Sequence, residues 1–481
     1  MKVSALDRRS EVQALPAALP ALEWTTDRER LALLSRDFAW FSPILKAELE
    51  GKAADISVRP RHAAELQQVV GECARRRIPL TLRGAATGNY GQCTPVQGGV
   101  LVDMGGLDRI AWQRGGVVRA EAGIRLAELE RRLRAEHSLE LRCMPSTFRV
   151  ATLGGLFAGG FGGVGSITWG PIAAPGNVLG AAALTVEPEP QVVELRGADA
   201  LALHHNWGTT GIVLELELAL APAQQWLEMA VVFGGGDGAG FDAALDFGNA
   251  LALAPGVPKR NVAVLADPVP GFLRARPQWE PVFPPDCSAA LLVVGAPAEA
   301  VVTDLAARFG GRVTHRADSI EAQRRNSTLM EMCWNHSTLY ALKADPGRTY
   351  LQCSFAAGEH LAQVRAVHAR YGRSGRGEAG AAAGGGMAPE VLMHVEFIRN
   401  LDGALICTAL PLVRYRGEAR LAEIIEGYRA LGVRVNNPHL RHVEDGRFGG
   451  TLPPASAAAK RRLDPLNLLN PGKLRTWPLP Q

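Results

Sequence analysis

A glycine-rich stretch decides the fold, and it reads Arg83-Gly84-Ala85-Ala86-Thr87-Gly88-Asn89-Tyr90-Gly91. Short apolar runs flank it, at residues 78–82 and 100–104, and both are typical of strands. Small side chains let a backbone approach a ligand closely, and consecutive N–H groups in such a turn form a concave nest for anions such as a pyrophosphate. Taken alone, the stretch favours the plainer interpretation, a glycine-rich loop that only connects two strands.

A second glycine-rich stretch follows. Pro145-Ser146-Thr147 precedes Ala151-Thr152-Leu153-Gly154-Gly155, and eight glycines fall within residues 154–170. Flexible linkers of this kind carry Ser and charge, whereas this stretch carries Phe157, Phe161, Val164 and Trp169. We therefore expect a buried loop that lies against a large planar ligand.

Part of this stretch matches the dinucleotide fingerprint of the Rossmann fold. The match is Gly160-x-Gly162-x-x-Gly165, and Glu187 lies about 20 residues further on. The fingerprint must also open a helix. The residues that follow, 166–176, include two prolines and two glycines, which leave no room for a crossover helix. We reject the Rossmann interpretation.

Periodicity predicts the elements around these loops. A helix is expected from Ala63, because the apolar residues Leu66, Val69, Val70, Cys73 and Ala74 share one face. Alternating or apolar runs predict strands at residues 117–122, 181–186, 191–195 and 212–220. Apolar stripes predict helices at Leu126, Leu129 and Leu133, and at Leu421, Ile424, Ile425, Tyr428 and Leu431. Residues 234–240 and 374–389 are expected to be loops.

Composition limits the class of protein. A chain of 481 residues is too long to fold around one compact core, so we expect two or more domains. Its content of 47% hydrophobic and 21% charged residues is ordinary for a globular protein. The net charge of +4 is spread along the chain without a basic block, so nucleic-acid binding is not expected. Seven scattered cysteines without a CxxC pair favour free thiols. No transmembrane run and no signal peptide are recognisable, so we expect a cytoplasmic protein.

Four motifs in this order resemble a known family. They are RGAATGNYG, PSTFRVATLGG with its glycine-rich sequel, GTTGIV at 208–213, and Leu463-Asp464-Pro465-Leu466-Asn467-Leu468-Leu469-Asn470-Pro471-Gly472-Lys473. The set resembles FAD-linked oxidases of the vanillyl-alcohol oxidase / p-cresol methylhydroxylase (PCMH) type, and most of all their glycolate oxidase and D-lactate dehydrogenase branch. The resemblance is strong over residues 55–222 and 460–475 and weak between them.

The resemblance implies an α+β fold with a two-lobed PCMH-type FAD-binding domain and an α+β substrate (cap) domain. It implies a helical lead-in at residues 1–50, the FAD-binding domain at 51–222, the substrate domain at 223–450 and a C-terminal segment at 451–481 that returns to the FAD-binding domain. The residues that it assigns to FAD are Arg83, Gly84, Ala85, Ala86, Thr87, Gly88, Asn89, Tyr90, Gly91, Pro145, Ser146, Thr152, Gly154, Gly155, Gly165, Gly170, Thr209, Gly211, Ile212, Asn470 and Lys473.

The mode of FAD attachment is read from the first loop. Some members of the family bind FAD covalently through a His in this loop, but here the loop has Asn89 and Tyr90 and no His. Cys93 lies nearby but off the pattern. We expect non-covalent FAD.

The chain departs from the family at the substrate site. It lacks the His-x-Gly-Asp-Gly-Asn and Glu-His-Gly stretches of glycolate-oxidase-type relatives, and the comparable region is Met393-His394-Val395-Glu396-Phe397. A His-x-Glu pair on a strand points both side chains to one face, which suits a ligand or an acid/base step. A half-buried strand with a hydrogen-bonded His is the alternative. Arg399 is expected to pair with a substrate carboxylate.

Three histidines are candidates for the catalytic base, because a neutral imidazole accepts protons near pH 7. In order they are His439, expected to face the flavin, His336 and His394. Glu396, Arg399 and Tyr340 are the expected substrate residues, although the segment 332–340 could equally be a packed core. Metal ligation by His439, His442 and Glu444 has only weak support, and no metal is expected.

The resulting expectation is an FAD-dependent oxidoreductase acting on CH–OH donors, which takes hydride from a small hydroxy acid or a related alcohol. A sugar-alcohol or aldonolactone oxidase, and a non-catalytic flavin-binding subunit of a larger complex, are the alternatives. The expected partner is a small-molecule substrate. The electron acceptor and the oligomeric state, a homo-oligomer included, are left open by the sequence.

Overall fold

The computed structural model describes residues 5–160, 162–234, 239–372, 389–445, 450–475 and 477, with side chains from residue 9 onward. The chain divides into two compact units. The first comprises Met1–Gly162, Ile172–Ala223 and Pro438–Gln481, and the second comprises Gly163–Pro171 and Gln224–Asn437. Both mix helices and sheets, so the α+β class is confirmed.

The first unit opens with short helices. They are α1 (Ala5–Ala18), α2 (Arg28–Leu34), η1 (Ala39–Phe41) and α3 (Pro43–Glu48), with strand β1 (Glu23–Thr25) after α1. Two begin at capping side chains: Asp27 accepts a hydrogen bond from the N–H of Arg30 at 2.8 Å, and Ser42 accepts one from the N–H of Leu45 at 3.1 Å. Such caps satisfy N–H groups that have no partner inside the helix.

The first lobe is a four-stranded sheet in the order β1-β2-β4-β3. Strands β2 (Ile56–Arg59), β3 (Leu80–Arg83) and β4 (Val100–Asp103) run parallel to one another, and β1 pairs with β2 antiparallel. The crossover from β2 to β3 is α4 (Ala63–Arg75), whose predicted apolar face is buried. This arrangement places the loop 83–91 directly after β3, in the connection to β4.

The second lobe is a six-stranded sheet in the order β5-β6-β10-β8-β9, with β7 also paired to β10. Its strands are β5 (Ile110–Arg114), β6 (Val117–Glu121), β7 (Leu139–Leu141), β8 (Val178–Leu184), β9 (Val192–Arg196) and β10 (Ile212–Pro222). The helices of this region are η2 (Met104–Gly106), α5 (Leu126–His137), α6 (Leu153–Gly159) and α8 (Ala198–Leu201). The strands and the helix predicted here are confirmed, with ends shifted by a few residues.

The glycine-rich segment corrects one expectation. It is not a loop throughout, because α6 begins at Leu153, where the side chain of Thr152 caps the helix by accepting a hydrogen bond from the N–H of Gly155. The sequence Leu-Gly-Gly-Leu-Phe-Ala-Gly still contains an apolar i, i+3, i+4 pattern, which buries Leu153, Leu156 and Phe157. After Gly165 there is only the single-turn helix α7 (Ser166–Trp169), so no crossover helix follows the glycines.

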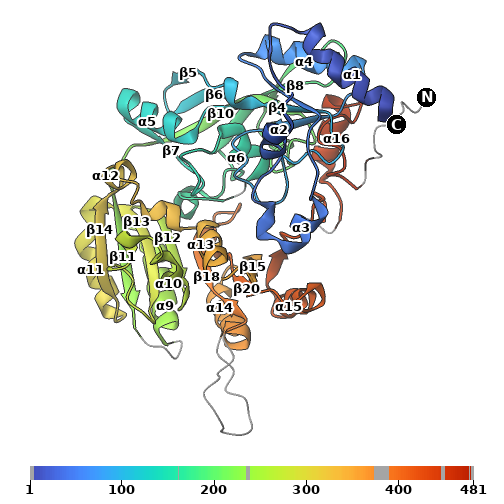
Figure 1. Ribbon diagram of the computed structural model, residues 1–481. Coiled ribbons are helices and arrows are strands. Elements are labelled where there is room, and N and C mark those ends of the chain that lie inside the picture. Colours follow the sequence, from blue (N-terminus) through green and yellow to red (C-terminus); the bar gives the residue numbers. More distant parts are fainter. Residues whose placement is uncertain are drawn as a thin grey trace. The chain divides into compact units, whose positions relative to one another are not determined.

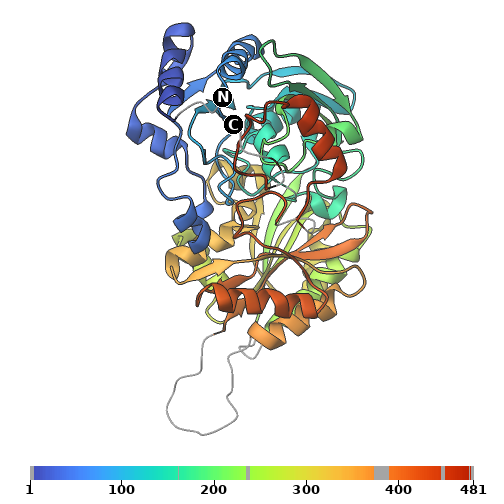
Figure 2. The same cartoon turned by 90° about the vertical axis from the view of Figure 1, so that its right-hand side faces the viewer.

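The C-terminal segment, Pro438–Gln481, belongs to the first unit. Helix α16 (Pro454–Leu463) ends at a carbonyl that accepts from the N–H of Val186 at 2.7 Å, and the carbonyl of Leu468 accepts from the N–H of Leu80 at 2.8 Å. Figures 1 and 2 both show this red helix beside the blue-to-green elements of the first unit.

The second unit is built on an eight-stranded sheet in the order β14-β11-β13-β12-β18-β19-β16-β21. Its strands are β11 (Trp226–Phe233), β12 (Lys259–Leu265), β13 (Ser288–Gly295), β14 (Arg312–Asp318), β16 (Gln352–Ser354), β18 (His394–Arg399), β19 (Leu405–Ala409) and β21 (Arg434–Asn436). Helices α9 (Ala239–Leu253), α11 (Glu299–Arg308), α14 (His360–Val367) and α15 (Glu418–Ala430) pack against it (Figure 1).

A smaller antiparallel sheet, β15-β20-β17, completes this unit. Its strands are β15 (Arg348–Tyr350), β17 (Val391–Leu392) and β20 (Leu412–Arg414), and the remaining helices are α10 (Val269–Leu273), η3 (Pro277–Trp279), η4 (Ala296–Ala298), α12 (Ser319–Arg324), η5 (Leu329–Met332), α13 (His336–Ala344) and η6 (His368–Gly372). The expected loop at 234–240 lies partly outside the described residues and ends in α9. The expected loop at 374–389 lies almost wholly outside them.

Candidate functional site

The first predicted cofactor loop is bent by residues with left-handed backbone. Ala86 has φ +55° and Gly91 has φ +69°. The side chain of Arg83, expected at a pyrophosphate, instead donates to the carbonyl oxygens of Leu34 at 2.6 Å and Arg36 at 3.2 Å. Arg83 therefore fastens the start of the loop to the N-terminal segment, while the backbone of the loop is the part left to face a ligand.

The first two loops pack directly against each other. A Cβ atom on Gly84 would lie 2.3 Å from Oγ1 of Thr152, and one on Gly154 would lie 2.7 Å from the Cβ of Ala122. The hydroxyl groups of Thr87 and Thr147 lie 3.4 Å apart. Real Cβ atoms do not approach this closely, so glycine at position 84 lets the two stretches meet, and glycine at position 154 lets the second stretch pack against the end of β6.

The third predicted loop joins them through an aromatic pair. The rings of Tyr90 and Trp207 stack with centroids 5.4 Å apart and planes 11° from parallel. Trp207 and His205 both have positive φ, a conformation that costs energy for residues other than glycine. The buried Nε1 of Trp207 has no hydrogen-bond partner within the described part of the chain.

Of the other predicted residues of this loop, Thr209 bonds within it, and Gly211 packs tightly against Leu463. The hydroxyl of Thr209 donates to the carbonyl of Asn206 at 2.7 Å, and a Cβ on Gly211 would meet Leu463 at 2.8 Å. Ile212 is buried at the start of β10.

The C-terminal residues bridge the same loops. The amide of Asn470 donates to the carbonyls of Gln92 at 2.7 Å and Trp207 at 2.8 Å, and Nζ of Lys473 donates to the carbonyl of Gly91 at 2.6 Å. Oδ1 of Asn470, although buried, has no hydrogen-bond partner among the described residues. Asn470 and Lys473 were predicted here, and the structure brings both to the loops.

Burial sets the titration of the groups beneath the first loop. It lowers the pKa of the fully buried Lys473 to about 8, against the opposing effect of the nearby Asp37 carboxylate. It raises the pKa of Asp37 to about 6 and that of the Cys93 thiol to about 12. Cys93 therefore stays a protonated thiol at neutral pH, which makes it a poor nucleophile.

These features fit FAD. Closely packed glycines leave backbone groups to receive a pyrophosphate, and the partnerless Nε1 of Trp207 and Oδ1 of Asn470 are a buried donor and acceptor that a polar cofactor could satisfy. Pro145 and Ser146 lie in the second stretch, within the first unit. Gly165 and Gly170 flank α7 in the second unit, with φ +102° and +71°.

In the second unit, His394 and Glu396 form a buried polar cluster on β18. Nε2 of His394 lies 2.9 Å from Oε1 of Glu396, and its Nδ1 lies 2.6 Å from the hydroxyl oxygen of Ser337. Glu396 also accepts from the N–H of Trp334 at 2.9 Å and from the amide of Asn261 at 3.4 Å. The exposed fractions of His394, Ser337 and Glu396 are 0, 0 and 1%, so both ring nitrogens are occupied by protein groups inside a closed cluster.

Sequence reasoning found only part of this cluster. The His-x-Glu spacing indicated that both side chains share a face, but Ser337 and Asn261 were missed. They come from α13 and β12, and only strand pairing and helix packing bring them beside β18. No local pattern in the sequence carries that information.

His336 and Tyr340 lie on one face of α13, where both are partly exposed. The phenol of Tyr340 lies 3.3 Å from Nη1 of Arg276, and Nζ of Lys343 lies 5.9 Å from the centre of the Tyr340 ring. Desolvation, together with the charges of Arg276 and Lys343, lowers the pKa of His336 to about 4. His336 is therefore neutral at pH 7 and sits in a cationic environment.

The remaining predicted residues are not part of these groups. Arg399 donates to the carbonyl of Gly403 at 2.8 Å in an exposed turn. His439 belongs to the first unit, where it is buried and its Nδ1 lies 2.7 Å from the hydroxyl oxygen of Ser42.

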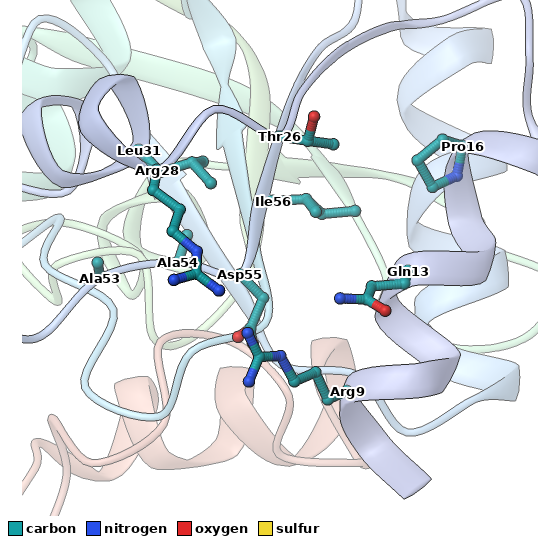
Figure 3. Close-up of a pocket in the computed structure, with 10 residues that line it drawn as sticks. All are labelled: Arg9, Gln13, Pro16, Thr26, Arg28, Leu31, Ala53, Ala54, Asp55 and Ile56. Atoms are coloured by element: carbon teal, nitrogen blue, oxygen red, sulfur yellow. The ribbon is translucent and has the colours of Figure 1, made fainter. Parts of the chain in front are cut away.

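A cavity of about 530 Å³ in the first unit is separate from all these residues. It is lined by α1, α2 and the start of β2, and Figure 3 shows Arg9 and Arg28 directed toward Asp55. None of the predicted site residues lines it. Within the described ranges, no helix is long and apolar enough to cross a membrane, and no three His, Cys, Asp or Glu side chains are grouped to hold a metal.

Comparison with known proteins agrees with the fold and with FAD as the cofactor. Residues 54–194 match a family model described as an FAD binding domain. The chain is 27% identical to glycolate oxidase subunit GlcD of Escherichia coli K12 over 231 residues, which are 45% of this chain and 43% of that one. It is 31% identical to an uncharacterized oxidoreductase, ORF5 in the fasciation locus of Rhodococcoides fascians, over 112 residues, or 22% and 24% of the two chains.

The fold is shared over a longer span. Two crystal forms of alkyldihydroxyacetonephosphate synthase superpose with TM-scores of 0.62 and 0.64. They cover 96% and 97% of this chain and 85% and 86% of theirs, at 16% and 14% sequence identity. At that identity the likeness concerns the fold alone.

The chain thus carries a PCMH-type FAD-binding domain, and FAD is its cofactor. The two curated relatives named above are described as a subunit of a glycolate oxidase and as an oxidoreductase. It matches less than half the length of GlcD.

Proposed function

We propose that this protein is an FAD-dependent oxidoreductase that binds FAD non-covalently and takes hydride from a small 2-hydroxy acid or a related alcohol. The observation that carries the proposal is the convergence of the loops at 83–91, 145–155 and 204–211 with Asn470 and Lys473 in a domain that matches an FAD-binding family. The similarity to a glycolate oxidase subunit supports a hydroxy acid as the substrate class.

Non-covalent attachment follows from the chemistry of the loop. The first loop has no His, and the single nearby thiol, that of Cys93, is buried with a raised pKa. A protonated, enclosed thiol does not attack a flavin ring. FAD, when bound, supplies the two-electron acceptor.

The second unit is proposed as the substrate domain, with His336 as the base. Of the three candidate histidines, His394 and His439 are 0 and 2% exposed, whereas His336 is partly exposed. A neutral imidazole at pH 7 can accept the proton of the substrate hydroxyl. The neighbouring Arg276 and Lys343 would attract a carboxylate, and that anion would offset the charges that depress the pKa of His336.

The buried cluster then has a positioning role. Ser337 follows His336 directly, and its contact with His394 fixes the first turn of α13. Glu396 accepts a hydrogen bond from the N–H of Trp334, two residues before His336. Both ends of the turn that presents His336 are thus tied to β18.

A flavin-binding subunit of a larger complex is the second candidate, since the named relative is itself a subunit. Steady-state turnover of the purified protein with an artificial electron acceptor distinguishes this subunit from an enzyme that is active by itself. A panel of 2-hydroxy acids, sugar alcohols and aldonolactones should give turnover with hydroxy acids first. Turnover with sugar alcohols or aldonolactones alone would move the substrate class, and no turnover with any of them would favour the subunit.

A further inference from the structure

One peptide group at the end of the first cofactor loop lies between two opposite charges. The carbonyl oxygen of Gly91 accepts from Nζ of Lys473 at 2.6 Å, and the N–H of the next residue, Gln92, donates to Oδ2 of Asp37 at 2.8 Å. Lys473 comes from the chain after α16, and Asp37 comes from the segment after α2. The two ends of the chain therefore hold the same peptide bond.

The orientation of this peptide matches the field of the two charges. A peptide dipole has its negative end at the oxygen and its positive end at the N–H. Here the oxygen faces the ammonium and the N–H faces the carboxylate. A flipped peptide would turn its oxygen toward Asp37, and at a buried site such an arrangement is strongly unfavourable. The two charges thus select one conformation of the turn.

Neighbouring contacts extend this hold along the loop. Oδ1 of Asp37 accepts from the N–H of Ala39, and the N–H of Phe38 donates to the carbonyl of Gly88 at 2.8 Å. The side-chain amide of Gln92 donates to the carbonyl of Gly159 at 3.1 Å, at the end of α6. The turn at 91–92 is therefore the point where the N-terminal segment, the C-terminal segment and the second glycine-rich stretch meet.

We propose that Asp37 and Lys473 are positioning residues for FAD, which clamp the Gly91–Gln92 peptide and so set the shape of the loop that receives the cofactor. Both lie outside residues 54–194, the part that matches the FAD-binding family. The cofactor site of this chain is thus completed by its two ends. This inference rests on FAD binding and not on the substrate class.

The test uses full-length variants stripped of FAD and titrated with FAD while flavin fluorescence is recorded. Lys473→Met keeps the length of the side chain and removes its charge, and Asp37→Asn keeps the shape and removes the opposite charge. Each should weaken FAD binding by about 10- to 100-fold, the effect expected when one charge-assisted hydrogen bond is lost and its partner is left buried.

Arg119→Met is the matched control. Arg119 joins Glu194 and Glu217 on the six-stranded sheet, and none of these residues bonds the cofactor loops. It should lower the melting temperature of the apo protein and leave the FAD dissociation constant within about twofold of the wild type, the range expected for a site with no shared partners.

The double variant Asp37→Asn/Lys473→Met distinguishes a clamp from a general loss of packing. Its loss of FAD binding free energy should be smaller than the sum of the losses in the two single variants, because no unpaired charge remains. Strictly additive losses, or single variants that bind FAD like the wild type, would overturn the proposal. Should Lys473→Met not fold, the FAD dissociation constant of Asp37→Asn alone tests the proposal, and a wild-type value would overturn it. Absence of turnover would count against the proposed oxidoreductase and would leave these affinities unaffected.

Discussion

Nδ1 of His394 lies 2.6 Å from the hydroxyl oxygen of Ser337, the residue that directly follows His336 at the start of α13. The contact joins the central sheet of the second unit to the helix turn that presents the proposed base. We therefore propose that His394 and Glu396 do not react with the substrate themselves but hold His336 in position.

His336→Gln should lower kcat by about 10²-fold or more, since a positioned general base contributes about 10²–10⁴-fold. The FAD content and the melting temperature near pH 8 should stay close to those of the wild type. Rapid-mixing measurement of flavin reduction gives the rate constant directly. Reduction at the wild-type rate would exclude His336 as the base and return attention to His394 and His439.

Glu396→Gln should lower kcat through the position of α13. The amide preserves the size of the side chain but removes the charge that faces Nε2 of His394. We expect a loss of about tenfold or more, with an unchanged FAD dissociation constant. Glu390→Gln, at a partly exposed pair with Arg420, is the control that should leave kcat unchanged. Equal rates in both variants would contradict the positioning role.

The acid sensitivity of the fold should depend on His336. Its folded-state pKa of about 4 lies below the ordinary histidine value of 6.5, so the unfolded chain binds the additional proton between these two pH values. Stability is therefore lost as pH falls from about 6.5 toward 4 and is unaffected by this group above that window. His336→Gln should narrow the difference in melting temperature between pH 8 and pH 5. An unchanged difference would show that His336 titrates normally.

Gly84→Ala should weaken FAD binding by about tenfold or more. Its Cβ would lie 2.3 Å from Oγ1 of Thr152, so the two cofactor loops must separate. Gly116→Ala, in the β5–β6 turn with open space around its Cβ, is the matched control. Fluorescence titration of both apo proteins with FAD measures the effect, and equal dissociation constants would argue against the packed-loop cradle.

Acid precipitation should release all of the flavin into the supernatant, because Cys93 is a buried thiol whose pKa is raised to about 12. Cys93→Ala should behave in the same way. A yellow pellet from the wild type and a colourless one from Cys93→Ala would show a covalent link through this cysteine.

The elements that the sequence predicts well are those with strong periodicity. The apolar face of α4 and the alternation of β10 specify their structure locally, and the order of the glycine-rich motifs identifies the FAD-binding domain. Helix α6 was missed because its three glycines conceal an apolar face that becomes evident only when Leu153, Leu156 and Phe157 are seen buried. Glycine has a low intrinsic helix propensity, and packing overrode it here.

The candidate site was predictable only in part. The cofactor loops and Asn470 could be found from motifs, whereas the role of Arg83 could not, since its partners are carbonyls of Leu34 and Arg36 about 50 residues away. Asp37 lies in a segment without any motif, and its significance comes from a single peptide bond far along the chain. The solvent exposure that favours His336 over His394 as the base is likewise a property of the folded chain and cannot be read from the sequence.

The proposed oxidoreductase function is tested most directly by an anaerobic titration of the FAD-loaded protein with 2-hydroxy acids, followed by the visible absorbance of the flavin. We expect at least one hydroxy acid to bleach the bound flavin completely and His336→Gln to slow the bleaching. A protein that holds FAD yet whose flavin no hydroxy acid reduces, while dithionite does, would contradict the proposed oxidoreductase function.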